Sequence, residues 1–510
     1  MNNAKEKTEL NLWAVYGICF LISTIFFLLF GFNSPIYVFN SDPDYQWFMT
    51  MGNGLVHGKI PYRDLFEQKG PIVYFVTAFC CLFQNPGIVM LIIEIFSMSL
   101  FFFFAYRICR KHLNTFYSLT ALPILAFAIF TCWCRLFSAA TIEEFCLPIY
   151  TYFLLCWLEF LQEKRSWNWI RSLCLGLCFG IILWVKYTLI YFMLVPMLIW
   201  FIISIYRKQI RIIFLNALYI LAGILIISAP IVLFYALQQA LDDLFYVYFY
   251  VNLTAYKPSG SNVHLKTFQL FFEIGPAILI LILVGITFFS IRYWRHTGWL
   301  LLTAFIVNLI MIVFTSNKSI YYYGQLAPYA IFGAICLLQW FNQKFTPSHK
   351  RKLIYTGLVI ICLAISFPLS TLVTKELGRD KKDYTPLVIA DVIHNYAKNN
   401  NLETSLLCYK THEYGFYNTT KIIPNNYFFV RNVIEENRFP LMYTEFENYI
   451  INQTSNFVIV HDYIWNEEED FLSRYYHPYT GDIESSTYQY YKLKYNKHIK
   501  LNLVLLVKNI

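Results

Sequence analysis

The chain has 510 residues, of which 58% are hydrophobic, 20% aromatic and only 14% charged, and its mean hydropathy is +0.48. Because about a quarter of the residues of an average soluble domain are charged, this composition excludes a soluble globular protein, and its apolar content excludes a disordered one. Hydrophobicity sustained over this length predicts repeated membrane spans, so the net charge of +9 is not by itself a sign of nucleic-acid binding.

Long apolar segments predict eleven transmembrane helices. They are 11–31, 88–106, 115–132, 146–161, 172–187, 188–206, 212–237, 267–291, 298–315, 322–341 and 353–373. The run 71–83 is also apolar, but a helix of this length covers only about 20 Å of a hydrocarbon core that is about 30 Å thick. We therefore expect 71–83 to be interfacial or re-entrant.

The charges predict the orientation of these spans. With 71–83 lying flat, seventeen Lys and Arg residues fall in loops on one side and eight in short loops on the other. The positive-inside rule then places the N-terminus in the cytoplasm and residues 374–510 outside the membrane. We expect a transmembrane domain at 1–373, with a first outer loop at 32–87, and an extracytoplasmic domain at 374–510. All five Asp residues before residue 374 fall on predicted outer loops: Asp42, Asp44, Asp64, Asp242 and Asp243.

The C-terminal segment has the composition of a soluble domain. Its apolar patterns predict helices near 385–398 and 440–452, strands at 405–409 and 457–460, and a final pair of strands at 488–495 and 499–507. The predicted fold class is therefore a mainly α, polytopic membrane protein. It has about eleven transmembrane helices, an amphipathic first outer loop and a small C-terminal α/β domain.

The first half of the outer loop carries an acidic motif. Asp42 followed by Pro43 is typical of a helix N-cap, and the apolar residues that follow predict an amphipathic helix on the outer leaflet. Asp44 falls in the first turn, where the helix dipole favours the ionised carboxylate, and such a group can accept a proton from a hydroxyl. The alternative is that Asp42 and Asp44 only cap the helix.

The second half of the loop reads PYRDLFEQKGP, and two cations in it flank two acids. Arg63 and Lys69 at the level of the lipid headgroups can bind a phosphate, although interfacial anchoring or local ion pairs with Asp64 and Glu67 are the alternative. A carboxylate and two cations at the outer interface suit a reaction on a phosphate-linked lipid.

The order of these elements and the PYRDLFEQKGP string resemble the GT-C superfamily of membrane glycosyltransferases, near its protein mannosyltransferase and aminoarabinose transferase branch. The resemblance is closest to bacterial members that decorate surface glycans. It implies transfer of a hexose or pentose from a polyprenyl-phosphate donor to a glycan, lipid or protein acceptor on the outer face, without a cofactor. A divalent metal is not expected, although Asp42 and Asp44 are able to hold one. The usual adjacent Asp-Glu pair is interrupted here by Pro43, so both Asp residues remain candidates for the base, with Asp44 preferred.

The resemblance also suggests binding residues. For the donor phosphate these are Lys69, Arg63 and Lys186 in WVKYT. For the acceptor or donor sugar they are Asp64, Glu67, Glu143 and Glu144 in TIEEFCLP, and Tyr322 and Tyr323 in YYYGQLAPY. For each of these motifs, interfacial anchoring is an alternative.

Other classes of membrane protein predict different features. A flippase or transporter of lipid-linked glycans predicts charges that line a path and repeated halves. Glu94 and Glu273 lie near spans, but no repeat is evident. If the protein were a glycan polymerase, we would expect a large outer loop in mid-chain, whereas the long patterned loop follows the first span. If it were a receptor, the pattern of this first loop would have no explanation. We expect a multi-pass cell-membrane enzyme whose partners are a lipid-linked sugar and a surface glycan, and no nucleic acid.

Overall fold

The computed structural model describes residues 10–132, 137–163, 166–256, 262–315, 319–344, 351–480, 490–493, 497–500 and 503–509. The chain forms two compact units. The first comprises Met1–Ile36, Met90–Pro230 and Pro258–Leu377, and the second comprises Tyr37–Val89, Ile231–Lys257 and Gly378–Ile510. These units are defined by contacts and not by a membrane boundary, so the division into 1–373 and 374–510 stays a prediction.

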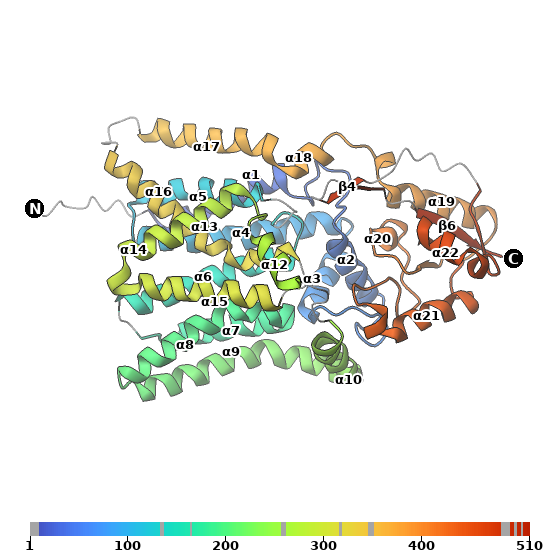
Figure 1. Ribbon diagram of the computed structural model, residues 1–510, viewed down its shortest axis with the longest axis horizontal. Helices are drawn as coiled ribbons and strands as arrows, with labels where there is room; N and C mark the ends of the chain where they lie inside the picture. Colours follow the sequence, from blue (N-terminus) through green and yellow to red (C-terminus); the bar gives the residue numbers. More distant parts are fainter. Residues whose placement is uncertain are drawn as a thin grey trace, which may run out of the picture. The chain divides into compact units, whose positions relative to one another are not determined.

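The first unit consists of helices. They are α1 (Leu12–Phe30), most of α4 (Pro86–Arg110), α5 (Thr115–Phe130), α6 (Ile142–Glu163), α7 (Trp169–Lys186), α8 (Tyr191–Tyr206), most of α9 (Ile210–Leu237), α12 (Val263–Phe271), α13 (Pro276–Val284), α14 (Ser290–Arg292), α15 (Trp299–Thr315), α16 (Ala330–Lys344), α17 (Arg351–Leu369) and α18 (Thr371–Glu376). Helices α5, α6, α13 and α15 run roughly parallel to one another (Figure 1).

Several of these helices are long and apolar enough to cross a membrane. Among the described residues there are six: Leu12–Phe30, Pro86–Arg110, Ile142–Gln162, Trp169–Tyr206, Ile210–Leu237 and Ile320–Gln343, or seven if the bent pair Val263–Phe271 and Pro276–Arg292 is one span. The run Trp169–Tyr206 is interrupted after α7, because the backbone of Lys186 is extended (φ −166°, ψ 95°). The polytopic helical fold is confirmed, whereas the number of eleven spans stays a prediction.

Small residues let neighbouring helices of the first unit approach closely. A Cβ atom on Gly176 of α7 would lie 2.1 Å from the carbonyl oxygen of Ile220, and one on Gly223 of α9 would lie 2.4 Å from that of Leu173. Only glycine allows backbone contact at this crossing, which is a common packing mode of apolar helices.

The N-terminal part of the second unit is built from α2 (Pro43–Val56) and α3 (Pro71–Cys81), which pack on each other. Thr77 Oγ1 donates a hydrogen bond to the Phe48 carbonyl at 2.8 Å, and Gly52 faces the same threonine. The predicted helix after Asp42 is confirmed, but residues 45–52 are all buried, so its contact with the outer leaflet stays a prediction. Helix α3 has 11 residues, so it is too short to span a membrane, as expected for 71–83. The same unit contains α10 (Leu241–Leu244), a π-helical segment (Phe245–Val251) and α11 (Asn252–Thr254).

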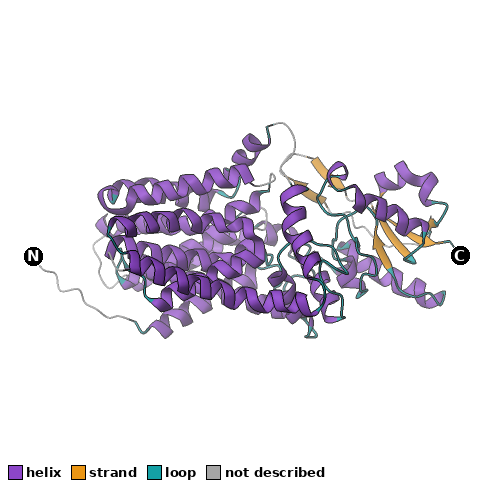
Figure 2. Ribbon diagram, turned by 90° about the horizontal axis from the view of Figure 1, so that it is seen from below, coloured by secondary structure: helices purple, strands orange, loops and turns teal. Residues whose placement is uncertain are grey.

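The C-terminal part of the second unit is an α/β arrangement, and the described strands all lie in it (Figure 2). Its elements are α19 (Thr385–Asn399), β1 (Leu406–Cys408), α20 (Phe416–Thr420), α21 (Pro440–Ile451), β2 (Phe457–His461), α22 (Asp462–Leu472), β3 (Tyr476–Pro478), β4 (Tyr490–Leu493), β5 (Lys497–Lys500) and β6 (Leu503–Lys508). The main sheet has the order β1-β2-β6-β3, with β1 parallel to β2 and the other pairs antiparallel.

The predicted final strand pair requires a correction. The segment 499–507 is not one strand: β5 pairs with β4, whereas β6 joins the main sheet beside β2, with Val458 opposite Leu506. The reason is burial, because Leu505, Leu506 and Val507 belong to the core and β2 is buried throughout. Residues 488, 489, 494, 495, 501 and 502 of the predicted pair lie outside the described residues.

Candidate active site

The two aspartates at the start of α2 have different surroundings. Asp42 is the N-cap, and its Oδ1 accepts a hydrogen bond from the backbone N–H of Tyr45 at 3.2 Å. Asp44 lies in the first turn and is half-buried. Asp42 therefore caps the helix, as the alternative interpretation predicted. The Asp44 carboxylate lies at the positive end of the helix dipole.

A C-terminal segment, residues 411–418, is fastened to the first turns of α2. Asn418 Nδ2 donates to both the backbone oxygen and Oε1 of Gln46, each at 2.7 Å, while Gln46 Nε2 donates to the Asn40 carbonyl. Gly415 has φ +101°, and a Cβ atom there would lie 2.4 Å from Phe39 Cζ. Glycine is therefore needed at this contact, which brings residues from far along the chain close to Asp44.

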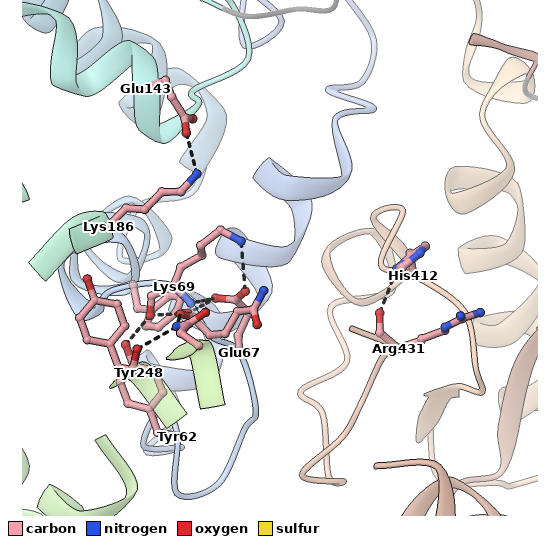
Figure 3. Close-up of polar contacts among 11 residues, drawn as sticks. Tyr62, Glu67, Lys69, Glu143, Lys186, Tyr248, His412 and Arg431 are labelled. Carbon is pink, nitrogen blue, oxygen red and sulfur yellow. Dashed lines mark hydrogen bonds and ion pairs between the residues drawn. The ribbon is translucent and has the colours of Figure 1, made fainter. Parts of the chain in front are cut away.

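Sequence reasoning missed His412, which lies near Asp44, and Arg431, which contacts His412. His412 Nδ1 lies 2.9 Å from the Arg431 carbonyl oxygen (Figure 3), and the Arg431 N–H donates to the Thr411 carbonyl at 2.8 Å. Burial lowers the pKa of His412, although its bond to the Arg431 carbonyl and the nearby negative charge of Asp44 oppose this effect. Since a carbonyl only accepts hydrogen bonds, Nδ1 carries the proton of the neutral imidazole and Nε2 is an acceptor.

The loop between α2 and α3 is closed by hydrogen bonds around Glu67. The Oε2 atom of Glu67 accepts from the Lys69 N–H at 2.7 Å and from the Tyr74 hydroxyl, and Tyr62 Oη donates to the Lys69 carbonyl at 2.5 Å. Lys69 Nζ lies 3.8 Å from Glu67 Oε1 (Figure 3). Glu67, predicted to bind a substrate, thus organises the turn that carries Lys69, and its contact with substrate stays a prediction.

Arg63 and Asp64 form a bidentate ion pair between neighbouring residues. Arg63 Nε and Nη2 donate to the two carboxylate oxygens of Asp64 at 3.0 and 2.9 Å, and Arg63 Nη1 donates to the Gln238 carbonyl at 2.8 Å. Partial burial opposes ionisation of Asp64, but the bonds from Arg63 and from the Ile60 N–H outweigh it and lower the pKa of Asp64. Arg63 and Asp64 therefore form the local ion pair that the alternative interpretation predicted.

In the first unit, Lys186 and Glu143 form a buried ion pair. Lys186 Nζ lies 2.8 Å from Glu143 Oε1 (Figure 3). The same atom lies 3.8 Å from the centre of the Tyr322 ring. Tyr323 instead donates its hydroxyl proton to the Thr267 carbonyl at 2.6 Å. The structure thus brings together three of the predicted binding residues, Lys186, Glu143 and Tyr322, and directs Tyr323 elsewhere.

Glu144 is buried beside a second acid, Glu94. The carboxylate of Glu94 accepts hydrogen bonds from Asn33 Nδ2 at 3.0 Å and from the Ala140 N–H at 2.8 Å. Glu94, which lies inside a predicted span, therefore has hydrogen-bond partners within the first unit. The sequence did not reveal these partners. Among the described residues, no group of three or more His, Cys, Asp or Glu side chains is placed to hold a metal ion.

Comparisons with known proteins define the class of this fold. Residues 69–234 match the family model described as dolichyl-phosphate-mannose-protein mannosyltransferase. No curated protein sequence matches the chain. The crystal structure of ArnT from Cupriavidus metallidurans bound to undecaprenyl phosphate is similar, with a TM-score of 0.63, 10% identity and 98% of each chain covered.

Two further structures share the fold. ArnT from the same bacterium in the apo state has a TM-score of 0.62 and 12% identity, with 98% of each chain covered. The Archaeoglobus fulgidus oligosaccharyltransferase in the apo form has a TM-score of 0.50 and 12% identity, with 99% of this chain and 77% of that chain covered. These matches and the family model confirm the predicted resemblance to the GT-C superfamily. The protein is a polytopic membrane glycosyltransferase.

Proposed function

We propose that this enzyme transfers a sugar from a polyprenyl-phosphate-linked donor to a cell-surface glycan, lipid or protein acceptor on the outer face of the membrane. We assign Asp44 as the catalytic base because the two aspartates at the start of α2 differ in their contacts. Asp42 caps the helix, whereas Asp44 is half-buried in the first turn. The lipid class is supported by the undecaprenyl phosphate bound to ArnT and by the dolichyl-phosphate-mannose in the description of the matched family.

In this proposal Asp44 accepts the proton of the acceptor hydroxyl while the hydroxyl oxygen attacks the anomeric carbon of the donor. The bond between that carbon and the phosphate oxygen breaks, and the polyprenyl phosphate leaves with the electron pair. Lys69 stabilises the negative charge that develops on the phosphate. Lys69 is preferred over Arg63 because the Arg63 guanidinium is engaged with Asp64 and Gln238.

The remaining assignments rest on the sequence. Lys186, Glu143, Glu144, Tyr322 and Tyr323 stay predicted binding residues. The cytoplasmic N-terminus and the extracytoplasmic position of residues 374–510 are supported by the seventeen basic residues in the loops of one side. Labelling of single cysteines, placed in the first outer loop of intact cells, by a membrane-impermeant reagent tests this orientation.

The central test is Asp44→Asn, with Asp42→Asn as the matched control. Asparagine caps a helix as well as aspartate does, so Asp42→Asn preserves the helix start, whereas Asp44→Asn removes the base and lowers transfer by about 10²- to 10⁴-fold. The measurement is the sugar composition of the surface glycan in cells that carry each variant at equal protein level. Unchanged glycan with Asp44→Asn contradicts the assignment. Loss of the whole polymer, instead of one added sugar, in cells without the protein favours the flippase or polymerase alternative.

A further inference from the structure

Several buried polar atoms in the second unit have no hydrogen-bond partner among the residues that the structure describes. They are Thr411 Oγ1, Glu413 Oε2, Arg431 Nε, and both Oδ1 and Nδ2 of Asn432. Thr411, Glu413 and Asn432 are 1%, 0% and 1% exposed. Buried polar groups are nearly always satisfied, so a concentration of unsatisfied ones within two short segments indicates a ligand.

These atoms belong to one place in the fold. The two segments are joined by the hydrogen bond from the Arg431 N–H to the Thr411 carbonyl at 2.8 Å and by the 2.9 Å contact between His412 Nδ1 and the Arg431 carbonyl. We call Thr411, His412, Glu413, Arg431 and Asn432 the 411–432 cluster; Figure 3 shows its two labelled members, His412 and Arg431.

The cluster is also attached to the helix that carries the proposed base. Asn418, a few residues after the cluster's first segment, donates two hydrogen bonds of 2.7 Å to Gln46, which is two positions after Asp44. The charge of Asp44 acts on His412 directly. A ligand held by the cluster is therefore next to the first turn of α2.

The chemistry of the cluster is mixed, and the guanidinium of Arg431 is its one permanent charge. Glu413 Oε1 accepts from the N–H groups of Gly415 and Tyr417 at 2.9 and 3.3 Å, and burial raises the pKa of Glu413 to about 8. Near neutral pH its Oε2 therefore carries a proton and acts as a donor. Together with the hydroxyl of Thr411 and the amide of Asn432, this set offers both donors and acceptors, which matches hydroxyl groups better than it matches phosphate alone.

We propose that the 411–432 cluster binds the acceptor, that this acceptor is a saccharide, and that the cluster presents one of its hydroxyls to Asp44. This proposal rests on the proposed function, because it assumes that Asp44 is the base. Arg431 is held in the cluster by the ring of Tyr443, which is 6% exposed and whose centre lies 5.8 Å from the guanidinium carbon.

The test uses the full-length protein in detergent and, as probe, surface polysaccharide purified from cells that lack the protein. Thr411→Val and Asn432→Leu each remove unsatisfied polar atoms without much change of volume. If these atoms serve a ligand, each variant binds the polysaccharide about tenfold more weakly, as expected for one or two lost hydrogen bonds, while its thermal unfolding midpoint is unchanged or higher.

Matched controls are Thr444→Val and Asn399→Leu, which alter exposed residues of α21 and α19 and should bind as the wild type does. Arg431→Gln is a third cluster variant that does not depend on apolar replacement, and it should also bind at least tenfold more weakly. Wild-type affinity in the cluster variants, absence of binding by the wild type, or weaker binding accompanied by a lower unfolding midpoint in all three variants overturns the proposal.

The Asp44→Asn variant separates this proposal from the proposed function. It should bind the polysaccharide as the wild type does, yet transfer no sugar. If Asp44→Asn still transfers sugar, the proposed base is wrong. If it loses transfer while the cluster variants bind normally, only the acceptor site is wrong.

Discussion

Two lysine–glutamate pairs, one in each unit, differ in how tightly the charges meet. In the first unit, Lys186 Nζ and Glu143 Oε1 are 2.8 Å apart, and their side chains are 9% and 4% exposed. In the second unit, Lys69 Nζ and Glu67 Oε1 are 3.8 Å apart, and their side chains are 15% and 2% exposed. The Glu67 carboxylate also accepts hydrogen bonds from Tyr74 and from the Lys69 backbone.

From this difference we expect the two lysines to bind an anion with different strength. Glu143 neutralises Lys186 at hydrogen-bond distance, so a phosphate would have to compete with this carboxylate for the ammonium group. Glu67 lies farther from the ammonium group of Lys69 and shares its charge with two other donors, so it attracts this ammonium group less strongly than Glu143 attracts Lys186. The comparison therefore favours Lys69 as the donor contact.

The largest expected effect is on stability, from Glu143→Gln. This change leaves the buried ammonium of Lys186 without its counter-ion, and breaking a buried ion pair on one side typically costs about 3–5 kcal/mol. Glu67→Gln is the matched control and should cost roughly 1 kcal/mol, because its amide oxygen still accepts the hydrogen bonds that close the loop. Denaturant or thermal unfolding in detergent measures both. Equal losses in the two variants contradict the comparison.

Glu413 is a third buried carboxyl group, and the structure gives it no lysine partner among the described residues. The stability of the protein should therefore depend on pH through this group. Burial raises its pKa from the usual 4.5 to about 8, so the folded protein keeps a proton that the unfolded chain has lost. Its contribution to stability is therefore fully present below pH 4.5 and is lost as the pH rises to about 8, at a slope of about 1.4 kcal/mol per pH unit. Glu413→Gln should remove this component of the slope, as measured by unfolding midpoints between pH 5 and 8. The exposed Glu436→Gln should keep it, and identical pH profiles for Glu413→Gln and the wild type would show that Glu413 ionises normally.

Much of the fold was predictable because it follows from local patterns. Helix α2 begins where Asp42 and Pro43 predict it, and α19, α21 and β2 agree closely with the predicted segments. The division of 499–507 between β5 and β6 was not predictable, since strand partners depend on distant chain segments.

The site was predictable only in part, for the same physical reason. Asp42, Asp44, Lys69 and Glu67 stand in one patterned loop, so the sequence identified them together. His412 did not stand out, because its proximity to Asp44 depends on contacts such as that between Asn418 and Gln46, which are 372 positions apart. Arg431 did not stand out, because only the folded chain brings it to His412. A lone His and a lone Arg in a soluble segment carry no local signal that reveals such a contact.

The comparison also predicts a binding effect for Lys69→Met. Loss of a charge-assisted hydrogen bond costs about 1.5–3 kcal/mol, so the affinity for undecaprenyl phosphate should fall by roughly 10- to 150-fold. Titration of the lipid phosphate into detergent-solubilised protein measures this affinity. Lys59→Met, in the same loop, controls for general loss of positive charge and should lower the affinity by less than threefold, or about 0.6 kcal/mol. If the two variants lose affinity equally, Lys69 acts only through long-range charge.

The smallest expected effect concerns Arg63→Gln, because the Arg63–Asp64 pair is more exposed than either lysine pair, with side chains 38% and 27% exposed. An exposed ion pair contributes about 0.2–1 kcal/mol, and salt screens it. The lowered pKa of Asp64 makes this contribution present at neutral pH and lost as the pH falls through the folded-state pKa. Unfolding midpoints of Arg63→Gln and the wild type should therefore differ slightly at pH 7 in low salt and converge in 1 M salt, where the screening length is about 3 Å. A loss as large as that of Glu143→Gln, undiminished by salt, would mean that the bond from Arg63 to the Gln238 carbonyl, and not the ion pair, holds this loop in place.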